Sequence, residues 1–174
     1  NGLRASPHAN IRRASESPNH RAQALILQGS PHIQHLLPHL AQYVAEAHET
    51  PNPTNESPLG LAPPARCHPA LLRFAAHLVI FLATAGVPLG NGEENSALAT
   101  RLLVQYVDYL VRKDKKRLVA GYTSLIVDER VQVELYARFL ASLSPSVPSA
   151  QLSPAQTLCL QWADEAGLDV SRIT

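Results

Sequence analysis

One segment of the sequence, His68 to Ala85, is apolar on almost every side when it is drawn as a helix. Arg73 and His77 interrupt the run, and the apolar stretch after them is about half of the ~20 residues that a membrane span needs. A helix of this kind has to be covered by other helices over most of its surface. We therefore expect it at the centre of a stack of helices in a soluble protein, with no membrane span. Its large apolar residues are Leu71, Leu72, Phe74, Leu78, Val79, Phe81 and Leu82.

The rest of the chain also has helical periodicity, without the sustained alternation that indicates β-strands. Ser30 and Pro31 begin the clearest amphipathic pattern, and Pro38 inside it predicts a kink, or a break with a main body starting near Leu37. Helices of unequal length and no regular repeat predict an all-α fold, an irregular antiparallel α-helical solenoid. Further helices are expected over residues 20–28, 93–112, 117–126, 128–143 and 153–167.

The periodicity also predicts which side chains are buried. In the helix over 93–112, it places Asp108 and Arg112 mostly on the outer side. In the three helices that follow, it predicts buried positions at Leu118, Leu125 and Leu158, among others. Before the last of these helices, Ser153-Pro154 has the pattern of an N-cap followed by a first-turn proline.

Composition divides the chain into three parts. We expect residues 1–49 to be a helical segment, residues 50–66 a Pro-rich loop insertion, and residues 67–174 a helical solenoid segment within one continuous domain. The sequence contains no methionine and has no signal-peptide pattern, and it stops at Thr174 where a further helix is expected to start. These features predict a fragment of a longer chain. The two cysteines, Cys67 and Cys159, are expected to be free thiols.

Three histidines are the best candidates for a metal site. His32, His35 and His39 are spaced i, i+3 and i+7, so they share one flank of a helix and could bind zinc. No carboxylate or cysteine accompanies them at ligand spacing, so a polar helix face is the simpler interpretation. The acidic pairs at 128–129 and 164–165 fit helix ends equally well. With no nucleophile–base or phosphate-binding motif, we predict no enzyme, no catalytic residue, no metal and no cofactor.

The basic run at Lys113, Lys115, Lys116 and Arg117 has two interpretations. It could be a nuclear-import signal or a phosphate-binding patch. Its position between two helices favours cations that stabilise a helix C-terminus, and Asp114 reduces its charge. We therefore expect no direct contact with nucleic acid.

Several blocks resemble one known family, the scaffold nucleoporins of the Y-complex stem in the outer ring of the nuclear pore. This family contains a vertebrate one-hundred-seven-kilodalton subunit and a fungal eighty-four-kilodalton subunit. The similarity lies in the order of the blocks over Cys67 to Thr174, because none of them is a catalytic motif. The blocks are His68–Leu82 (HPALLRFAAHLVIFL), Tyr106–Arg112 (YVDYLVR), Leu118–Ser124 (LVAGYTS), Val133–Leu140 (VELYARFL) and Ala163–Thr174 (ADEAGLDVSRIT).

The resemblance implies an ancestral-coatomer-type scaffold at the nuclear pore complex of the nuclear envelope. It implies a role in pore assembly and in nucleocytoplasmic transport, including mRNA export. It also implies two partners, a sister ancestral-coatomer-type subunit and a propeller-plus-helix subunit at the stem end, without assigning either to residues here. The alternatives are a helical adaptor, such as a coat or tether subunit of vesicle traffic, and a metal protein that uses the histidine flank.

Overall fold

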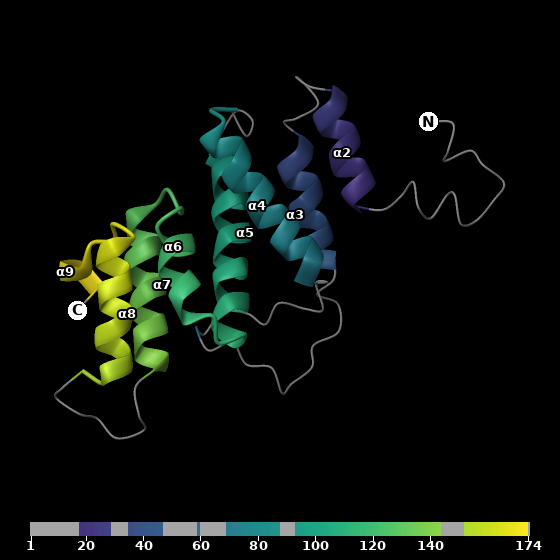
Figure 1. Ribbon diagram of the computed structural model, residues 1–174. Helices are drawn as coiled ribbons and strands as arrows, with labels where there is room; N and C mark the ends of the chain where they lie inside the picture. The colour runs from purple at the N-terminus through teal and green to yellow at the C-terminus, as the bar shows by residue number, and fades with distance from the viewer. Residues whose placement is uncertain are drawn as a thin grey trace. The chain divides into compact units, whose positions relative to one another are not determined.

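The computed structural model describes residues 18–28, 35–46, 59, 69–87, 93–143 and 152–173, and all regular structure in those ranges is helical. This confirms the all-α class, an irregular solenoid segment built from helices of unequal length. The helices are α2 (Pro18–Gln28), α3 (Leu36–Glu46), α4 (Pro69–Thr84), α5 (Glu93–Arg112), α6 (Lys116–Thr123), α7 (Glu129–Ser142), α8 (Pro154–Glu165) and α9 (Val170–Ile173) (Figure 1).

Contacts between Cα atoms group the chain into two compact units. The first unit contains residues 1–50 and 64–99, and the second unit contains residues 51–63 and 100–174. The boundary between the two units lies between residues 99 and 100, within α5, and it differs from the boundaries that composition predicts. The three parts predicted from composition remain a prediction. Of the predicted loop 50–66, only Leu59 lies within the described residues, and Cys67 and His68 lie outside them.

The first unit is built around α3, which contacts both α2 and α4 (Figure 1). Pro38 lies in the first turn of α3, where its missing N–H removes no bond within the helix. The predicted main body starting near Leu37 is therefore confirmed. The buried side chains of these three helices are Ala22, Leu36, Leu37, Leu40, Leu72, Ala75, Ala76, Val79 and Leu82.

Among the described residues, the fully buried positions of α4 lie along one side, whereas the sequence of His68 to Ala85 predicted cover on most sides. Its five buried residues recur at helical spacing from Leu72 to Leu82 and form one stripe. Phe81, outside this stripe, is 65% exposed. Contact with α3 accounts for the apolar residues on the covered side of α4. The sequence pattern did not indicate which of the other apolar side chains would be exposed to solvent.

Three of the described helices end in the same local geometry, with a residue of positive φ two positions after the last helical residue. At α4 this residue is Gly86, with φ 66°, and the amide of Val87 donates to the carbonyl of Leu82 at 3.0 Å. Gly167 does the same after α8, with φ 80°. After α5 the position is taken by Asp114, with φ 54°, a residue type that tolerates this conformation better than most. At two of these three positions the residue is glycine, which adopts a positive φ without a steric penalty.

The second unit packs α6 against α7 and α8, and α9 against the same two helices. Helices α7 and α8 run in opposite directions (Figure 1), and two hydrogen bonds join them. The Tyr136 hydroxyl donates to the carbonyl of Cys159 at 2.6 Å, and Gln156 Nε2 donates to the carbonyl of Leu140 at 3.1 Å. Both polar side chains are buried, so each bond satisfies groups that water does not reach.

Side-chain caps begin α7 and α8. The predicted start of α8 is confirmed. The backbone N–H of Gln156 donates to Ser153 Oγ at 3.2 Å, and the backbone N–H of Ser153 donates to Gln156 Oε1 at 2.8 Å. Pro154 occupies the first helical position. Asp128 caps α7 by accepting from the amide of Arg130 at 2.9 Å. These bonds satisfy amides that have no partner within the helix itself.

The prediction that Asp108 lies on the outer side of α5 is wrong. Asp108 is 1% exposed, and its Oδ2 lies 2.6 Å from Nη2 of Arg112, one helical turn later. Its neighbours Tyr106, Val107 and Leu110 are also buried, so the buried side of α5 is wider than the apolar stripe. Opposite charges at i and i+4 can meet on a helix, which allows the carboxylate to be buried as an ion pair.

Candidate functional site

The structure does not bring the candidate metal ligands together within its described residues. His35 is exposed and His39 is half-buried, and His32 lies outside those residues. In the ranges that the structure describes, no three His, Cys, Asp or Glu side chains are arranged to hold a metal ion. The same ranges contain no helix that is both long and apolar enough to cross a lipid bilayer.

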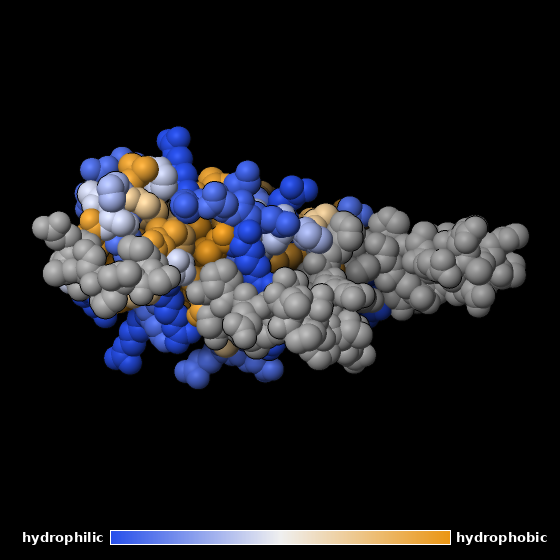
Figure 2. Space-filling model, turned by 90° about the horizontal axis from the view of Figure 1, so that it is seen from below, coloured by the Kyte–Doolittle hydropathy of each residue, from blue (hydrophilic) through white to orange (hydrophobic). Residues whose placement is uncertain are grey.

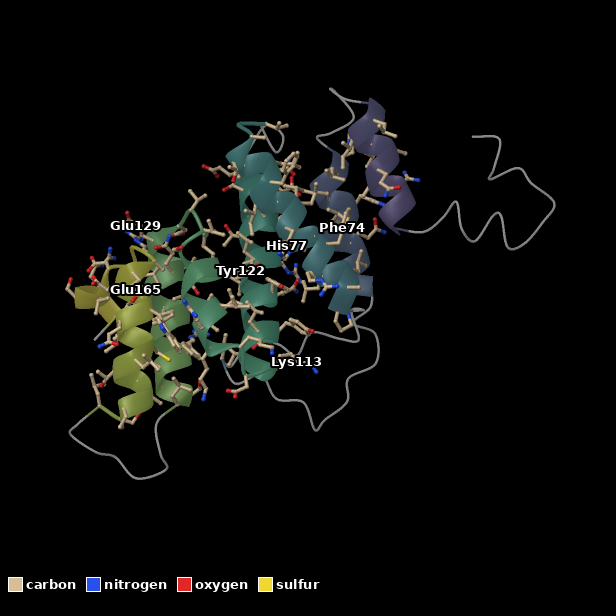
Figure 3. All side chains as sticks on the ribbon, viewed as in Figure 1. Phe74, His77, Lys113, Tyr122, Glu129 and Glu165 are labelled. Carbon is tan, nitrogen blue, oxygen red and sulfur yellow. The ribbon has the colours of Figure 1, made fainter. Side chains whose placement is uncertain are left out.

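The acidic pairs occupy helix ends, as predicted from their positions. Asp128 caps α7, and Glu129 Oε2 lies 3.5 Å from Nη1 of Arg172 in α9. Asp164 and Glu165 are exposed at the end of α8 (Figure 3). Their observed partners and exposure are those of solvated helix termini.

Cys159 has neither the exposure nor the environment of a reactive thiol. It is a free, buried cysteine on the covered side of α8. Burial raises the pKa of its thiol, and the Lys116 ammonium only partly offsets this effect. The neutral thiol is therefore favoured at physiological pH.

The basic run lies at the junction of α5 and α6, and two of its members have partners within the second unit. The Lys113 ammonium lies 6.0 Å from the centre of the Tyr109 ring, at the end of α5 (Figure 3). Lys116 Nζ lies 3.2 Å from Asp114 Oδ1. Lys115 and Arg117 are exposed. The run thus forms a connector between two helices in which some cations have partners and others are solvated. This agrees with the prediction that these cations lie at the C-terminus of a helix.

Helix α6 and the turn after it carry large apolar side chains that reach solvent. We define the α6 surface as Leu118, Gly121, Leu125 and Val127. Leu118 and Gly121 are spaced i and i+3 in α6, and Leu125 and Val127 follow in the turn after it. Leu118 is 47%, Leu125 46% and Val127 84% exposed, which corrects the prediction that Leu118 and Leu125 are buried.

The correction at α6 has a simple cause. The helix ends at Thr123, and its buried residues are Val119, Ala120 and Thr123, so the covered side is rotated away from the leucines. Leu158 in α8 was predicted to be buried and is also exposed. Figure 2 likewise shows hydrophobic residues at the surface among hydrophilic ones on the face that it displays. The α6 surface, bordered by the basic run, is the candidate functional site of the second unit.

Comparison with known families gives a match over the whole chain. The profile of the family described as "Nuclear pore protein 84 / 107" matches residues 1–174. No solved structure matches the chain.

Curated relatives match over a shorter stretch. The Drosophila melanogaster protein "Nuclear pore complex protein Nup107" is 34% identical over 106 residues, which are 61% of this chain and 11% of the relative. The proteins of the same name from Homo sapiens and Mus musculus are each 32% identical over 104 residues, 60% of this chain and 10% of theirs. The matched stretch is thus about a tenth of the length of these relatives.

Proposed function

The chain belongs to the nuclear pore protein 84 / 107 family, and from this premise we propose that it is a segment of a structural scaffold subunit in the outer-ring Y-shaped coat of the nuclear pore complex. The family match over all 174 residues is the observation that carries the proposal. The all-α architecture of the described residues supports it, because an α-solenoid acts by offering the surface of its stacked helices. The proposed location of the parent protein is the nuclear pore complex at the nuclear envelope.

In this proposal the protein is not an enzyme. Its role is to support pore assembly and, through the pore, nucleocytoplasmic transport including mRNA export. Its partners are other Y-complex nucleoporins, a sister ancestral-coatomer-type subunit and a propeller-plus-helix subunit at the stem end. It makes no direct contact with nucleic acid, and it uses no cofactor.

We propose that one such partner covers the α6 surface. Several large apolar side chains that reach solvent within one short stretch are typical of positions that a partner protein covers. The exposed Lys115 and Arg117 next to them favour a partner that presents apolar side chains flanked by carboxylates. The expected occupant is therefore an acidic, amphipathic helix of another scaffold subunit.

The experiment is co-purification and imaging of the tagged parent protein with Leu118 and Leu125 both changed to aspartate. We expect the wild type at the nuclear rim, bound to Y-complex subunits, and the double variant to lose at least one of them. Leu158→Asp is the matched control, because it adds a charge at another exposed leucine of the second unit. A melting temperature equal to that of the wild type shows that the double variant is folded.

The outcomes separate the two parts of the proposal. If the wild type lies in cytoplasmic puncta and binds no Y-complex subunit, the scaffold proposal is wrong and a vesicle-coat adaptor replaces it. If the wild type behaves as expected and the folded double variant keeps every partner, only the assignment of the α6 surface is wrong.

A further inference from the structure

Gly121 is a glycine that the described fold does not require. It is exposed inside α6, and it is not one of the glycines with positive φ, so other residues can adopt its backbone conformation. A Cβ atom added at residue 121 would meet nothing within 4 Å in the described part of the chain beyond its neighbours in the helix. Glycine inside a helix is less stable than alanine. The chain therefore accepts a loss of stability at residue 121 that these contacts do not explain.

The helix around Gly121 is held from its other side. The buried residues of α6 face away from Gly121, and the helix contacts both α7 and α8. Tyr122, the next residue, packs edge-on against Tyr106 of α5, with ring centres 4.9 Å apart (Figure 3). These contacts hold the backbone at residue 121 in place and leave its outer side open to solvent.

Large apolar side chains precede and follow this open position. Leu118 lies three residues before Gly121 in α6, and Leu125 follows in the turn after the helix. The two leucines are 47% and 46% exposed. When helices pack, a large side chain of one helix inserts among the side chains of the other. A position without a side chain next to exposed leucines is suited to receive such a group.

The charges beside Gly121 indicate the chemistry of the partner. Lys115 and Arg117 are exposed at the start of α6, and residues 115–127 include no acidic residue. The nearby Asp114 pairs with Lys116, with Oδ1 and Nζ 3.2 Å apart. A partner that presents carboxylates beside its apolar side chain therefore meets the opposite charge here.

We propose that an acidic, amphipathic helix of another scaffold subunit crosses α6 at Gly121 and places one large aliphatic side chain over this glycine, next to Leu118 and Leu125. The carboxylates of that helix then lie toward Lys115 and Arg117. A side chain at residue 121 would hold the partner away, which explains the glycine. This inference rests on the proposed function, and it names the central contact of the α6 surface.

The first experiment compares Gly121→Ala with the wild type in two measurements. Alanine should raise the melting temperature of the chain by roughly 1–3 °C, because it favours the helix and has room in the folded chain. In the parent protein, the same change should weaken binding to a Y-complex assembled from its other subunits by about three- to tenfold, because the methyl group obstructs the partner. A gain in stability together with a loss of binding is the expected result.

Two further variants control this comparison. Gly121→Leu enlarges the obstruction and should weaken the same binding by more than about fiftyfold. Ser96→Ala raises the helix propensity at an exposed position of α5 in the first unit, and it should leave binding within about twofold of the wild type. If Ser96→Ala weakens binding as much as Gly121→Ala does, the effect is not one of contact at residue 121, and the inference is wrong.

A photo-crosslinking experiment identifies the occupant. Leu118→benzoylphenylalanine in the parent protein should crosslink to a helix of another Y-complex subunit, at an aliphatic residue with Asp or Glu within one helical turn. Leu158→benzoylphenylalanine, at an exposed leucine of α8, is the matched control and should not give this product. A crosslink from residue 118 to a basic or non-helical segment overturns the inference.

The remaining outcomes separate this inference from the proposed function. If Gly121→Ala binds within twofold of the wild type while the variant with Leu118→Asp and Leu125→Asp loses a partner, the α6 surface is an interface but Gly121 is not its central contact. A lower melting temperature for Gly121→Ala also overturns the inference, since the fold itself then requires the glycine. If the wild type binds no Y-complex subunit, the proposed function is wrong and this inference is wrong with it.

Discussion

At the scale of single residues, the Tyr136 hydroxyl connects the two longest helices of the second unit after α5. Its hydrogen bond to the Cys159 carbonyl crosses from α7 to α8, and both residues are buried. The Tyr136 ring also packs edge-on against Phe139, with ring centres 5.4 Å apart. The ring supplies apolar contact, and the hydroxyl supplies a partner for a buried carbonyl.

Tyr136→Phe separates these two contributions. The ring stays, and the Cys159 carbonyl loses its partner, so the free energy of unfolding should fall by about 1–2 kcal/mol. Urea unfolding followed by circular dichroism measures the change. Tyr109→Phe, at a half-buried tyrosine of α5, is the control and should change stability by less than about 0.5 kcal/mol. Equal losses in both variants would show that the bond between α7 and α8 contributes nothing of its own.

Single residues were also where the sequence was least informative. Asp108 has the residue type of a surface position, and its ion pair with Arg112 helps to compensate the cost of burying its charge. Leu59 lies in a stretch of sequence with no periodicity, yet it is buried, and its carbonyl accepts a hydrogen bond from Arg138, 79 residues away. The pattern of apolar residues that helix prediction uses does not indicate the burial of Asp108 or of Leu59.

At the scale of elements, the sequence predicted far more. Helix α8 begins at the predicted cap because the side chains of Ser153 and Gln156 each accept a hydrogen bond from the backbone N–H of the other residue. The start of α3 follows from Pro38 in the same local way. At α6 the burial of Leu118 and Leu125 was predicted wrongly, because which positions are covered depends on where α7 and α8 lie.

The Ser153 cap can be tested by itself. Ser153→Ala removes the acceptor for the Gln156 amide and should lower the free energy of unfolding by about 1 kcal/mol. Ser96→Ala, at an exposed position inside α5, is the control and should be neutral or slightly stabilising. Chemical denaturation of both variants provides the comparison. A loss at residue 96 as large as that at residue 153 would contradict a specific capping effect.

The covered side of α4 gives a second prediction at this scale. Ala76 has no exposed surface, so Ala76→Asp places an unpaired charge in the core of the first unit and should cost about 3 kcal/mol or more. Ala83→Asp adds the same charge at an exposed position of the same helix and should cost far less. Thermal unfolding distinguishes them. Similar melting temperatures for the two variants would mean that α4 is not covered at Ala76.

At the scale of the whole molecule, the resemblance to the family rests on residues that pack the helices. The resemblance was carried by blocks such as Tyr106–Arg112 and Val133–Leu140, and these contain much of the second unit's core, including Val107, Tyr136 and Phe139. These matching blocks therefore coincide with residues that hold the helices of the second unit together. The candidate α6 surface was identified from the exposure of its side chains, although Leu118 and Gly121 lie in one of the matching blocks.

The same core predicts how global stability depends on pH. Burial, followed by the nearby Cys159, raises the pKa of Tyr136 above its ordinary value of 10.0, and burial raises that of Cys159 above 9.0. The folded protein therefore keeps both protons at alkaline pH, where the unfolded chain releases them. Because the unfolded state then binds fewer protons, the free energy of unfolding falls as pH rises above about 9.

Denaturant unfolding at a series of pH values from 7 to 11 measures this dependence, with roughly constant stability expected up to about pH 8.5 and a decline beyond it. The double variant Tyr136→Phe with Cys159→Ala lacks both groups and should begin from a lower stability. Its decline between pH 9 and 11 should be shallower than that of the wild type, because two of the groups that favour the unfolded state are gone. Parallel profiles for the two proteins would place the alkaline sensitivity in other residues and would contradict a buried, proton-retaining pair between α7 and α8.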